Sequence, residues 1–149
     1  MEKTLVLIKP DAVQRGLSGE VFCRLERKGL KLVAMKFMQM TEEMAAEHYK
    51  EHQGKSFYPS LVNFITSGPV IAMVWQGPGA ISLVRNIMGA TDPQKAMPGT
   101  IRGDMAVFTG SNLVHGSDSP DSAAREISLF FNDQEILDYH LTLSPWIEG

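Results

Sequence analysis

Residues 4–11 read TLVLIKPD, a run of apolar and β-branched residues that ends in Lys9, Pro10 and Asp11. A short run of this kind, closed by proline and charge, predicts a buried strand whose end carries charged side chains. Residues 70–75, VIAMVW, form the longest uninterrupted apolar run and predict another strand. We therefore expect a β-sheet with buried strands, and the flanking segments indicate what surrounds it.

Helices and strands alternate along most of the remaining chain. Two more strands are expected at residues 30–40 and 112–115, and helices at 18–29, 41–54, 59–66, 80–89 and 119–132, with Ser18, Thr41 and Ser119 at helix starts and glycines at helix ends. The order β-α-β-α-α-β-α-β-α predicts an α/β sandwich. Its expected form is a four-stranded antiparallel sheet built from split β-α-β units, with helices on one face.

Two segments do not follow this alternation. Residues 90–110 are rich in proline and glycine and show no clear period. A loop of this length in a compact domain is usually functional or contains an unrecognised element. Residues 133–149 have little regular pattern but many apolar side chains, so we expect this tail to be packed on something.

Composition excludes several classes of protein. The 149 residues are 44% hydrophobic and 21% charged, which fits one globular domain spanning residues 1–149. The formal net charge of -3 argues against nucleic acid as the main ligand. A single cysteine, Cys23, excludes an intrachain disulfide, and no apolar run approaches the roughly 20 residues of a membrane span. The apolar core of residues 5–8 is too short for a secretory signal, so we expect a cytoplasmic protein.

Four histidines are candidate functional residues. His48 and His52 lie four apart on a predicted helix, a spacing that suits two metal ligands. However, Tyr49 stands where the metalloprotease pattern needs glutamate, and no third ligand is evident, so a helix face with two partly exposed histidines is the favoured interpretation. His140 lies in the tail, where a packing role is favoured.

His115 has a more informative setting, in the segment NLVHGSDSP at residues 112–120. It ends a predicted strand, and the helix start that follows supplies free N–H groups that attract anions. Glu126 borders the apolar face of that helix, where its carboxylate could bind one imidazole nitrogen, fix the tautomer and leave the other nitrogen as a nucleophile. From this segment alone, a structural histidine at a strand end remains an equal alternative.

Candidate phosphate-binding residues are scattered. The chain has no P-loop motif, and its candidate cations are Lys9, Arg85 and Arg102. Taken singly, each of these residues is better explained as a surface charge. A phosphate-binding role therefore requires that the three side chains lie close together in the folded chain. Phe57, at a predicted helix entry, could stack on a base or anchor that helix in the core, and the core role is favoured from the sequence alone.

At residues 112–119 the segment NLVHGSDS resembles the active-site signature of the nucleoside diphosphate kinase family, N-x-x-H-G-S-D-S. Other segments resemble the family in the same order: TLVLIKPDAV, RGL, GE, LVAMKF, HY, FYPSLVNFITSGPVIAMVW and PGTIRGD. The resemblance extends from about Glu2 to Ile147, essentially the whole chain.

The resemblance implies a ferredoxin-like α/β sandwich and a phosphotransferase. The expected reaction moves the γ-phosphate of a nucleoside triphosphate, typically ATP, to a nucleoside diphosphate such as GDP through a phosphohistidine on His115, in two half-reactions. The implied catalytic residues are His115, Glu126, Lys9, Tyr49 and Ser117. The implied nucleotide-binding residues are Lys9, Phe57, Leu61, Arg85, Thr91, Arg102, Thr109 and Asn112.

The resemblance also implies a cofactor and an assembly. Mg²⁺ is expected on the nucleotide phosphates, with Asp118 reaching it through water and no direct protein ligand. Thr109 stands where the family suggests valine or a similar apolar residue, and we expect at most a mild change in base preference. The tail and the proline-rich loop at residues 92–99 resemble those of hexameric members, so we expect a hexamer. A regulatory module without catalysis is the main alternative, and a phosphate relay from histidine to other proteins is a side activity left open.

Overall fold

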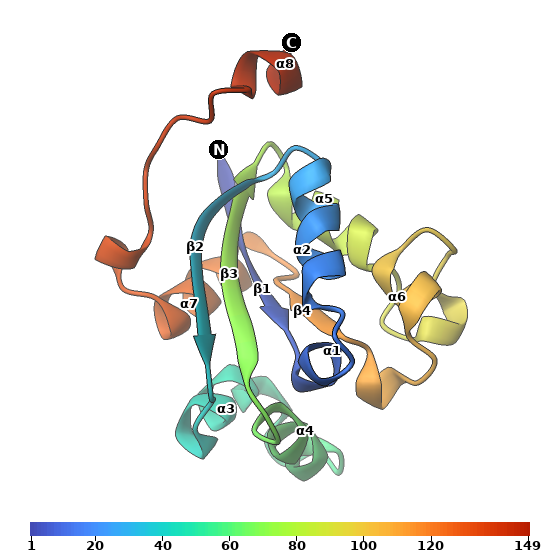
Figure 1. Cartoon of the computed structure of the whole chain (residues 1–149). Coiled ribbons are helices and arrows are strands. Elements are labelled where there is room, and N and C mark those ends of the chain that lie inside the picture. The colour runs from blue at the N-terminus through green and yellow to red at the C-terminus, as the bar shows by residue number, and fades with distance from the viewer.

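The computed structural model describes residues 1–149 and contains the predicted four-stranded antiparallel sheet, in the order β2-β3-β1-β4 (Figure 1). The strands are β1 Glu2–Ile8, β2 Lys31–Met38, β3 Val70–Gly77 and β4 Val114–Gly116. The helices are α1 Pro10–Gln14, α2 Ser18–Arg27, α3 Glu42–His48, α4 Tyr58–Ile65, α5 Ala80–Met88, α6 Ile101–Met105, α7 Pro120–Phe130 and α8 Ser144–Glu148. Short 3₁₀ turns lie at Lys50–His52, Pro93–Lys95, Thr109–Ser111 and Asp133–Glu135.

Helices cover both faces of the sheet, which corrects the expectation of a single covered face. In β1, Val6 and Ile8 pack with α2 and α5, while Leu5 and Leu7 pack on the other face with residues of α3, α4 and α7. The central strands β1 and β3 are therefore buried on both sides. This arrangement explains why both strands are continuous apolar runs rather than alternating ones.

Most helix starts follow the predicted capping. The side chain of Thr41 accepts a hydrogen bond from the Met44 N–H, and that of Ser119 accepts one from the Ser122 N–H. Ser18 is the exception, because it is the first residue of α2 and makes no cap hydrogen bond. The helix expected to reach residue 54 ends earlier, at His48, and continues as a 3₁₀ turn.

The segment at residues 90–110 is not an unstructured loop. It contains α6, whose first turn is capped by Thr100, with the Gly103 N–H donating to Thr100 Oγ1. The chain then enters β4 through Leu113, the one non-glycine residue with positive φ, at 75°. A hydrogen bond of 2.9 Å from the Val114 N–H to the Asn112 carbonyl makes this a tight γ-turn.

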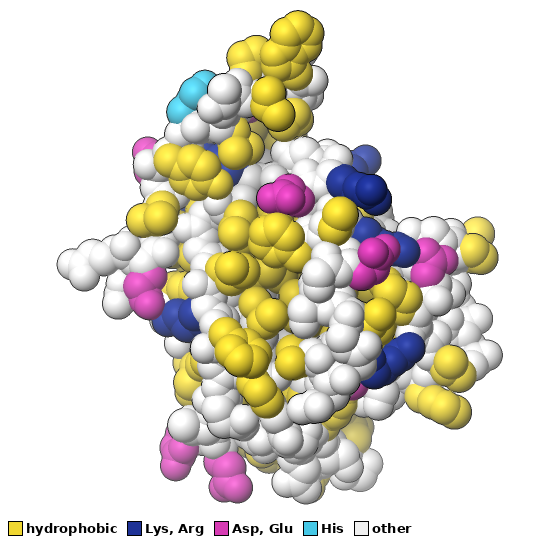
Figure 2. Space-filling model, viewed as in Figure 1, with side chains coloured by type: hydrophobic (Ala, Val, Ile, Leu, Met, Phe, Trp, Pro, Cys, Tyr) yellow, Lys and Arg dark blue, Asp and Glu magenta, His cyan; other side chains and the backbone are white.

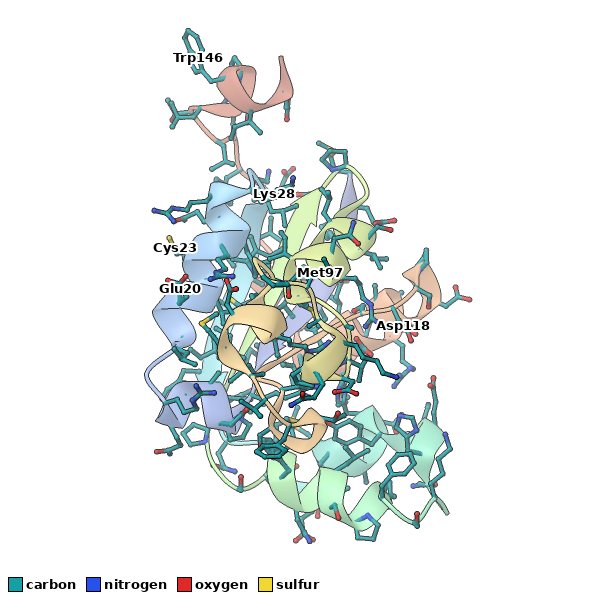
Figure 3. All side chains as sticks on the ribbon, turned by 90° about the vertical axis from the view of Figure 1, so that its right-hand side faces the viewer. Glu20, Cys23, Lys28, Met97, Asp118 and Trp146 are labelled. Atoms are coloured by element: carbon teal, nitrogen blue, oxygen red, sulfur yellow. The ribbon has the colours of Figure 1, made fainter.

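The C-terminal tail runs along the outside of the molecule and ends in α8, apart from the sheet (Figure 1). Trp146 is 87% exposed and points outward (Figure 3), and His140 is exposed as well. Within one chain only part of the tail is packed on the body, as where the Leu137 N–H donates to the Val33 carbonyl, and the expected packing of the rest stays a prediction. Figure 2 shows hydrophobic side chains on the tail and on the neighbouring face of the body. None of the helices combines the length and the apolar character that a membrane span requires.

Candidate active site

His115 lies in the middle of β4, directly opposite Leu7 of β1. Directly opposed residues in an antiparallel pair project to the same face of a sheet. The imidazole of His115 therefore rises on the Leu7 face, which α7 and α3 cover, and its side chain keeps 23% exposure to solvent. The strand sets the backbone of His115, and the covering helices supply the groups around its ring.

Glu126 of α7 binds the imidazole of His115, as the sequence predicted. His115 Nε2 lies 2.9 Å from Glu126 Oε1, and the Ser117 hydroxyl donates to the same oxygen at 2.7 Å. The Ser117 hydroxyl in turn accepts a hydrogen bond of 3.2 Å from the Leu5 N–H. A chain of hydrogen bonds thus connects the backbone of β1 to the carboxylate and then to the ring.

The carboxylate also fixes the tautomer. Burial raises the pKa of Glu126, but the hydrogen bonds from His115 and Ser117 outweigh burial and the net pKa is lowered. Glu126 is therefore ionised and can only accept, so Nε2 of His115 carries the proton of the bond between them. In the neutral ring this leaves a lone pair on Nδ1, away from Glu126.

His48 is part of this site, contrary to its expected place on a partly exposed helix face. It is 5% exposed, and its ring centroid lies 4.7 Å from that of His115 in an edge-to-face contact. Neither ring nitrogen of His48 has a hydrogen-bond partner. Burial, followed by the charge of His115, lowers the pKa of His48 to about 3, so the ring is neutral at physiological pH.

Tyr49 extends the same group of rings outward. Its ring contacts that of His48 and lies near that of His52, which in turn lies 5.4 Å from the ring of Phe57. Burial, followed by the charge of Glu126, raises the pKa of Tyr49 to about 12, so the phenol keeps its proton. A row of aromatic rings thus connects the exposed Phe57 to His115.

Lys9 and Asn112 meet at the same end of the sheet. Lys9 Nζ donates to Asn112 Oδ1 at 2.8 Å, and the amide of Asn112 donates to the Thr91 carbonyl at 3.0 Å. Burial, followed by repulsion from Arg102, lowers the pKa of Lys9 to about 8. The ammonium is therefore charged at neutral pH, but burial and the nearby Arg102 destabilise its charge. A bound anion would stabilise it.

Arg102 is buried and donates to three backbone carbonyls, those of Asn112, Gly89 and Val114. It therefore holds together the segment that leads into β4. Burial, followed by repulsion from Arg85, lowers the pKa of Arg102 to about 10, which still leaves it charged at neutral pH. Arg85 donates to the Gly116 carbonyl at 3.3 Å, so Lys9, Arg85 and Arg102 all bind residues of the segment that contains His115.

The remaining candidates surround this centre. Phe57 is 47% exposed, Leu61 is partly buried, and Thr91 and Thr109 are exposed. Asp118 is exposed beside the start of α7 (Figure 3). No direct contact joins Phe57 to Thr109 or Asp118 to the cations, so their proposed roles depend on a bound nucleotide.

Two further residues, Asp11 and Leu113, support the turn before His115, and the sequence does not predict this role. Asp11 accepts a hydrogen bond of 3.1 Å from the Leu113 N–H, across 102 positions of sequence, and so holds the γ-turn before His115. Leu113 itself adopts a conformation that is strained for a branched residue, and its side chain is fully buried. Leucine has no turn signature in sequence, so only the fold reveals this role. Position 11 was recognised only as a charge at a strand end.

Comparison with known proteins identifies one family over nearly the whole chain. Residues 2–136 match the family model described as nucleoside diphosphate kinase. The nucleoside diphosphate kinase of Bacillus licheniformis is 57% identical over 147 residues, covering 99% of both chains. That of Archaeoglobus fulgidus is 58% identical over 147 residues, 99% of this chain and 97% of the relative.

A solved structure extends the agreement to three dimensions. The halophilic nucleoside diphosphate kinase from Halobacterium salinarum, determined in complex with CDP, superposes with a TM-score of 0.96 at 56% identity, over 98% of this chain and 97% of the other. The sequence match and the shared fold lead to one conclusion: this chain belongs to the nucleoside diphosphate kinase family, whose members are phosphotransferases.

Proposed function

We propose that this chain moves the γ-phosphate of a nucleoside triphosphate to a nucleoside diphosphate through a phosphohistidine on His115. The observation that carries the proposal is the hydrogen bond between His115 Nε2 and the buried Glu126 carboxylate. This bond keeps the proton on one ring nitrogen and leaves the lone pair of Nδ1 for attack on phosphorus.

Each half-reaction balances within this geometry. Nδ1 forms a bond to the γ-phosphorus while the bond to the β,γ-bridging oxygen breaks, and the nucleoside diphosphate leaves. The ring then carries positive charge, which the Glu126 carboxylate stabilises while the proton stays on Nε2. In the second half-reaction a β-phosphate oxygen of the acceptor attacks the phosphoryl group and returns the ring to its neutral form.

The surrounding residues supply positioning and charge. Lys9, Arg85 and Arg102 are proposed to neutralise the phosphates, and Asn112 and Thr91 to orient them. Tyr49, which keeps its proton, is proposed to donate to the transferred group. Ser117 is proposed to hold Glu126 in place, which its 2.7 Å hydrogen bond supports.

Phe57 and Leu61 are proposed to receive the base, with Thr109 on its other side. The ring of Phe57 is exposed, and stacking accepts every base because each has a π face. The CDP bound by the Halobacterium salinarum kinase supports a nucleoside diphosphate ligand here. We expect comparable kcat/KM for purine and pyrimidine diphosphates, and a strong bias would contradict a stacking site.

Mg²⁺ is proposed to arrive on the nucleotide phosphates. The donor set fits this, because three cations and one exposed carboxylate, Asp118, surround the site, and Mg²⁺ takes oxygen ligands mostly from phosphates and water. When bound, Mg²⁺ would neutralise charge on the β- and γ-phosphates. Asp118 would hold the ion through water. The cytoplasmic location expected from the sequence stays a prediction.

Initial-rate kinetics test this proposal. A phosphohistidine route predicts parallel lines when ATP is varied at several fixed GDP concentrations, and exchange of label between ATP and ADP without any other nucleotide. The His115→Gln variant should lose both. Intersecting lines without exchange would show direct transfer in a ternary complex, and a folded, ATP-binding protein without turnover would favour the regulatory module.

A further inference from the structure

We propose that His48, His115 and Glu126 form a binding site for a divalent transition-metal ion of the Zn²⁺ class, whose occupancy prevents phosphorylation of His115. One ligand atom from each residue lies within 4.8 Å of the other two. The three residues come from α3, β4 and α7, so folding alone brings them together. The second part of the proposal rests on the proposed function of His115.

His48 is the residue that points to a ligand. It is 5% exposed, yet neither ring nitrogen has a hydrogen-bond partner. Leaving a buried polar group unpaired destabilises the folded chain, and such a group calls for an explanation. A metal ion bound to His48 would satisfy one of these nitrogens. The phosphotransfer chemistry itself makes no use of either nitrogen.

The donor set selects the kind of metal. Two imidazoles and one carboxylate match the three protein ligands of open zinc sites, in which water or substrate fills the fourth position. Tetrahedral ligands at about 2.0–2.1 Å from zinc lie roughly 3.3 Å apart. Separations of up to 4.8 Å would therefore close by at most about 1.5 Å, while the 2.9 Å between His115 Nε2 and Glu126 Oε1 would open by about 0.4 Å. Mg²⁺ prefers oxygen ligands, and we expect it not to compete for this site.

The site also has an entry path and a supporting shell. His115 keeps 23% side-chain exposure, which gives an ion access from solvent, and Ser117 Oγ orients the Glu126 carboxylate. Arg125 Nη2, 3.9 Å from Glu126 Oε2, opposes a cation here. Removing this charge with Arg125→Gln should therefore tighten metal binding.

Metal binding and phosphorylation exclude each other through the tautomer of His115. The nitrogen that faces Glu126 is Nε2, which carries a proton in the metal-free site. A metal on Nε2 displaces that proton, and a neutral ring then holds its hydrogen on Nδ1. Nδ1 no longer has a lone pair for phosphorus, so the metal-bound protein is not a nucleophile.

Direct metal titration of the nucleotide-free protein tests the site. We expect isothermal titration with ZnCl₂, in a buffer containing excess Mg²⁺, to give one site per chain, and CoCl₂ to give visible absorption of a four- or five-coordinate ion. His48→Gln and Glu126→Gln should each weaken binding by more than about 10- to 100-fold, the range for loss of an outer-shell partner. His140→Gln changes an exposed histidine in the tail and is the matched control.

Thermal unfolding checks that each variant is folded. If His48→Gln does not fold, Glu126→Gln and the cobalt spectrum of the unmodified chain decide. No binding, or binding that survives the loss of His48 and Glu126, would overturn the site.

A labelling arm separates this proposal from the proposed function. Uptake of γ-phosphate from ATP, measured without zinc, reports on His115 alone. We expect preloading with Zn²⁺ to reduce uptake in the unmodified chain and in His140→Gln but not in folded His48→Gln. If the protein takes up phosphate but binds no zinc, only the metal proposal is overturned. If it binds zinc through His48 but takes up no phosphate, only the proposed function is overturned.

Discussion

At the scale of single residues, the chemistry depends on which nitrogen of His115 keeps its proton. Glu126 decides this through one hydrogen bond, and Ser117 and the backbone of β1 hold the carboxylate in position. The carboxylate stays ionised because hydrogen bonds offset its burial. The nucleophile is therefore prepared before any substrate binds.

Glu126→Gln should lower kcat while keeping the shape of the side chain. The amide provides no negative charge for the imidazolium that forms during transfer. Losing a hydrogen bond to a charged group costs about 1.5–3 kcal/mol, or roughly 10- to 150-fold in rate. Single-turnover phosphorylation measures the step directly, with thermal unfolding as the control for folding. A variant as fast as the parent would contradict the proposed role.

Lys9 should impose an upper pH limit on kcat/KM. Its pKa is lowered to about 8, so the free protein loses this positive charge as pH rises through that value and binds phosphates less well. Stability has the opposite trend. Between about 8 and 10.5 the unfolded chain binds more protons, and the free energy of unfolding should therefore rise with pH.

The pH profile of kcat/KM, compared with that of Lys9→Met, measures this limit. The variant should be slower throughout and should lack the decline near pH 8. A decline that persists in Lys9→Met would assign it to another group.

Contacts between neighbouring elements of the site are predictable from the sequence, whereas contacts between distant ones are not. The pairing of His115 with Glu126 was predicted because it needs only a strand end and one helix face that follows directly. The setting of His48 was missed because its burial comes from β4 and α7, far away in sequence. The resemblance supplied Tyr49 and Asn112 as site residues, which spacing alone does not identify.

At the scale of elements, residues 89–116 form the frame of the site. Arg102 binds the carbonyls of Gly89, Asn112 and Val114, and so fixes both ends of this segment. A residue expected only to clamp phosphate thus also supports the loop. Asp11 adds a contact to the strained turn at Leu113.

Gly103→Ala should disturb this frame. A Cβ added at Gly103 would collide with the Met97 carbonyl oxygen, so α6 must shift. Overpacking of this kind costs about 1–3 kcal/mol, and the shift should also raise KM for nucleotides because Arg102 is the adjacent residue. Gly110→Ala is the matched control, with no atom within 4 Å of the added carbon.

Urea unfolding and nucleotide KM are measured for Gly103→Ala and Gly110→Ala, and only Gly103→Ala should be destabilised with a raised KM. Equal stability of the two variants would show that this packing is not rigid.

The sequence predicted elements with strong local signals and missed those held by distant contacts. β1 and β3 were recognised because strands buried on both faces are continuous apolar runs. The five-residue helix α6 lacks a local period and is stabilised from outside, by the Thr100 cap and the bonds of Arg102. Continuous apolar runs in β1 and β3 also imply that helices cover both faces of the sheet. The expectation of one covered face did not take this into account.

At the scale of the whole molecule, the two-faced core and the tail have different roles. The core holds β1 and β4 in register, which places His115 between helices from distant parts of the chain. The tail leaves Leu143, Trp146 and Ile147 exposed, and Met97, Val107 and Phe108 are exposed around the proline-rich loop. Large exposed apolar groups of this kind are typical of surfaces that bind another protein.

These exposed side chains fit an association of several copies of the chain, and the hexamer stays a prediction. We expect sedimentation equilibrium to give a hexamer for the unmodified chain, and Trp146→Ala with Phe108→Ser to shift it toward smaller species without unfolding the subunit. The substitution Glu148→Gln, on the exposed end of the tail, is the control. A tetramer or dimer for the unmodified chain would contradict the prediction.

The most direct test of a phosphohistidine on His115 is phosphate capture. The protein is mixed with γ-labelled ATP and Mg²⁺, quenched, and the label is tested for stability before a chase with GDP. We predict acid-labile, base-stable label that moves to GDP and is absent from folded His115→Ala. Label on another residue, or no label on a folded protein that still binds ATP, would contradict the phosphotransfer proposed here.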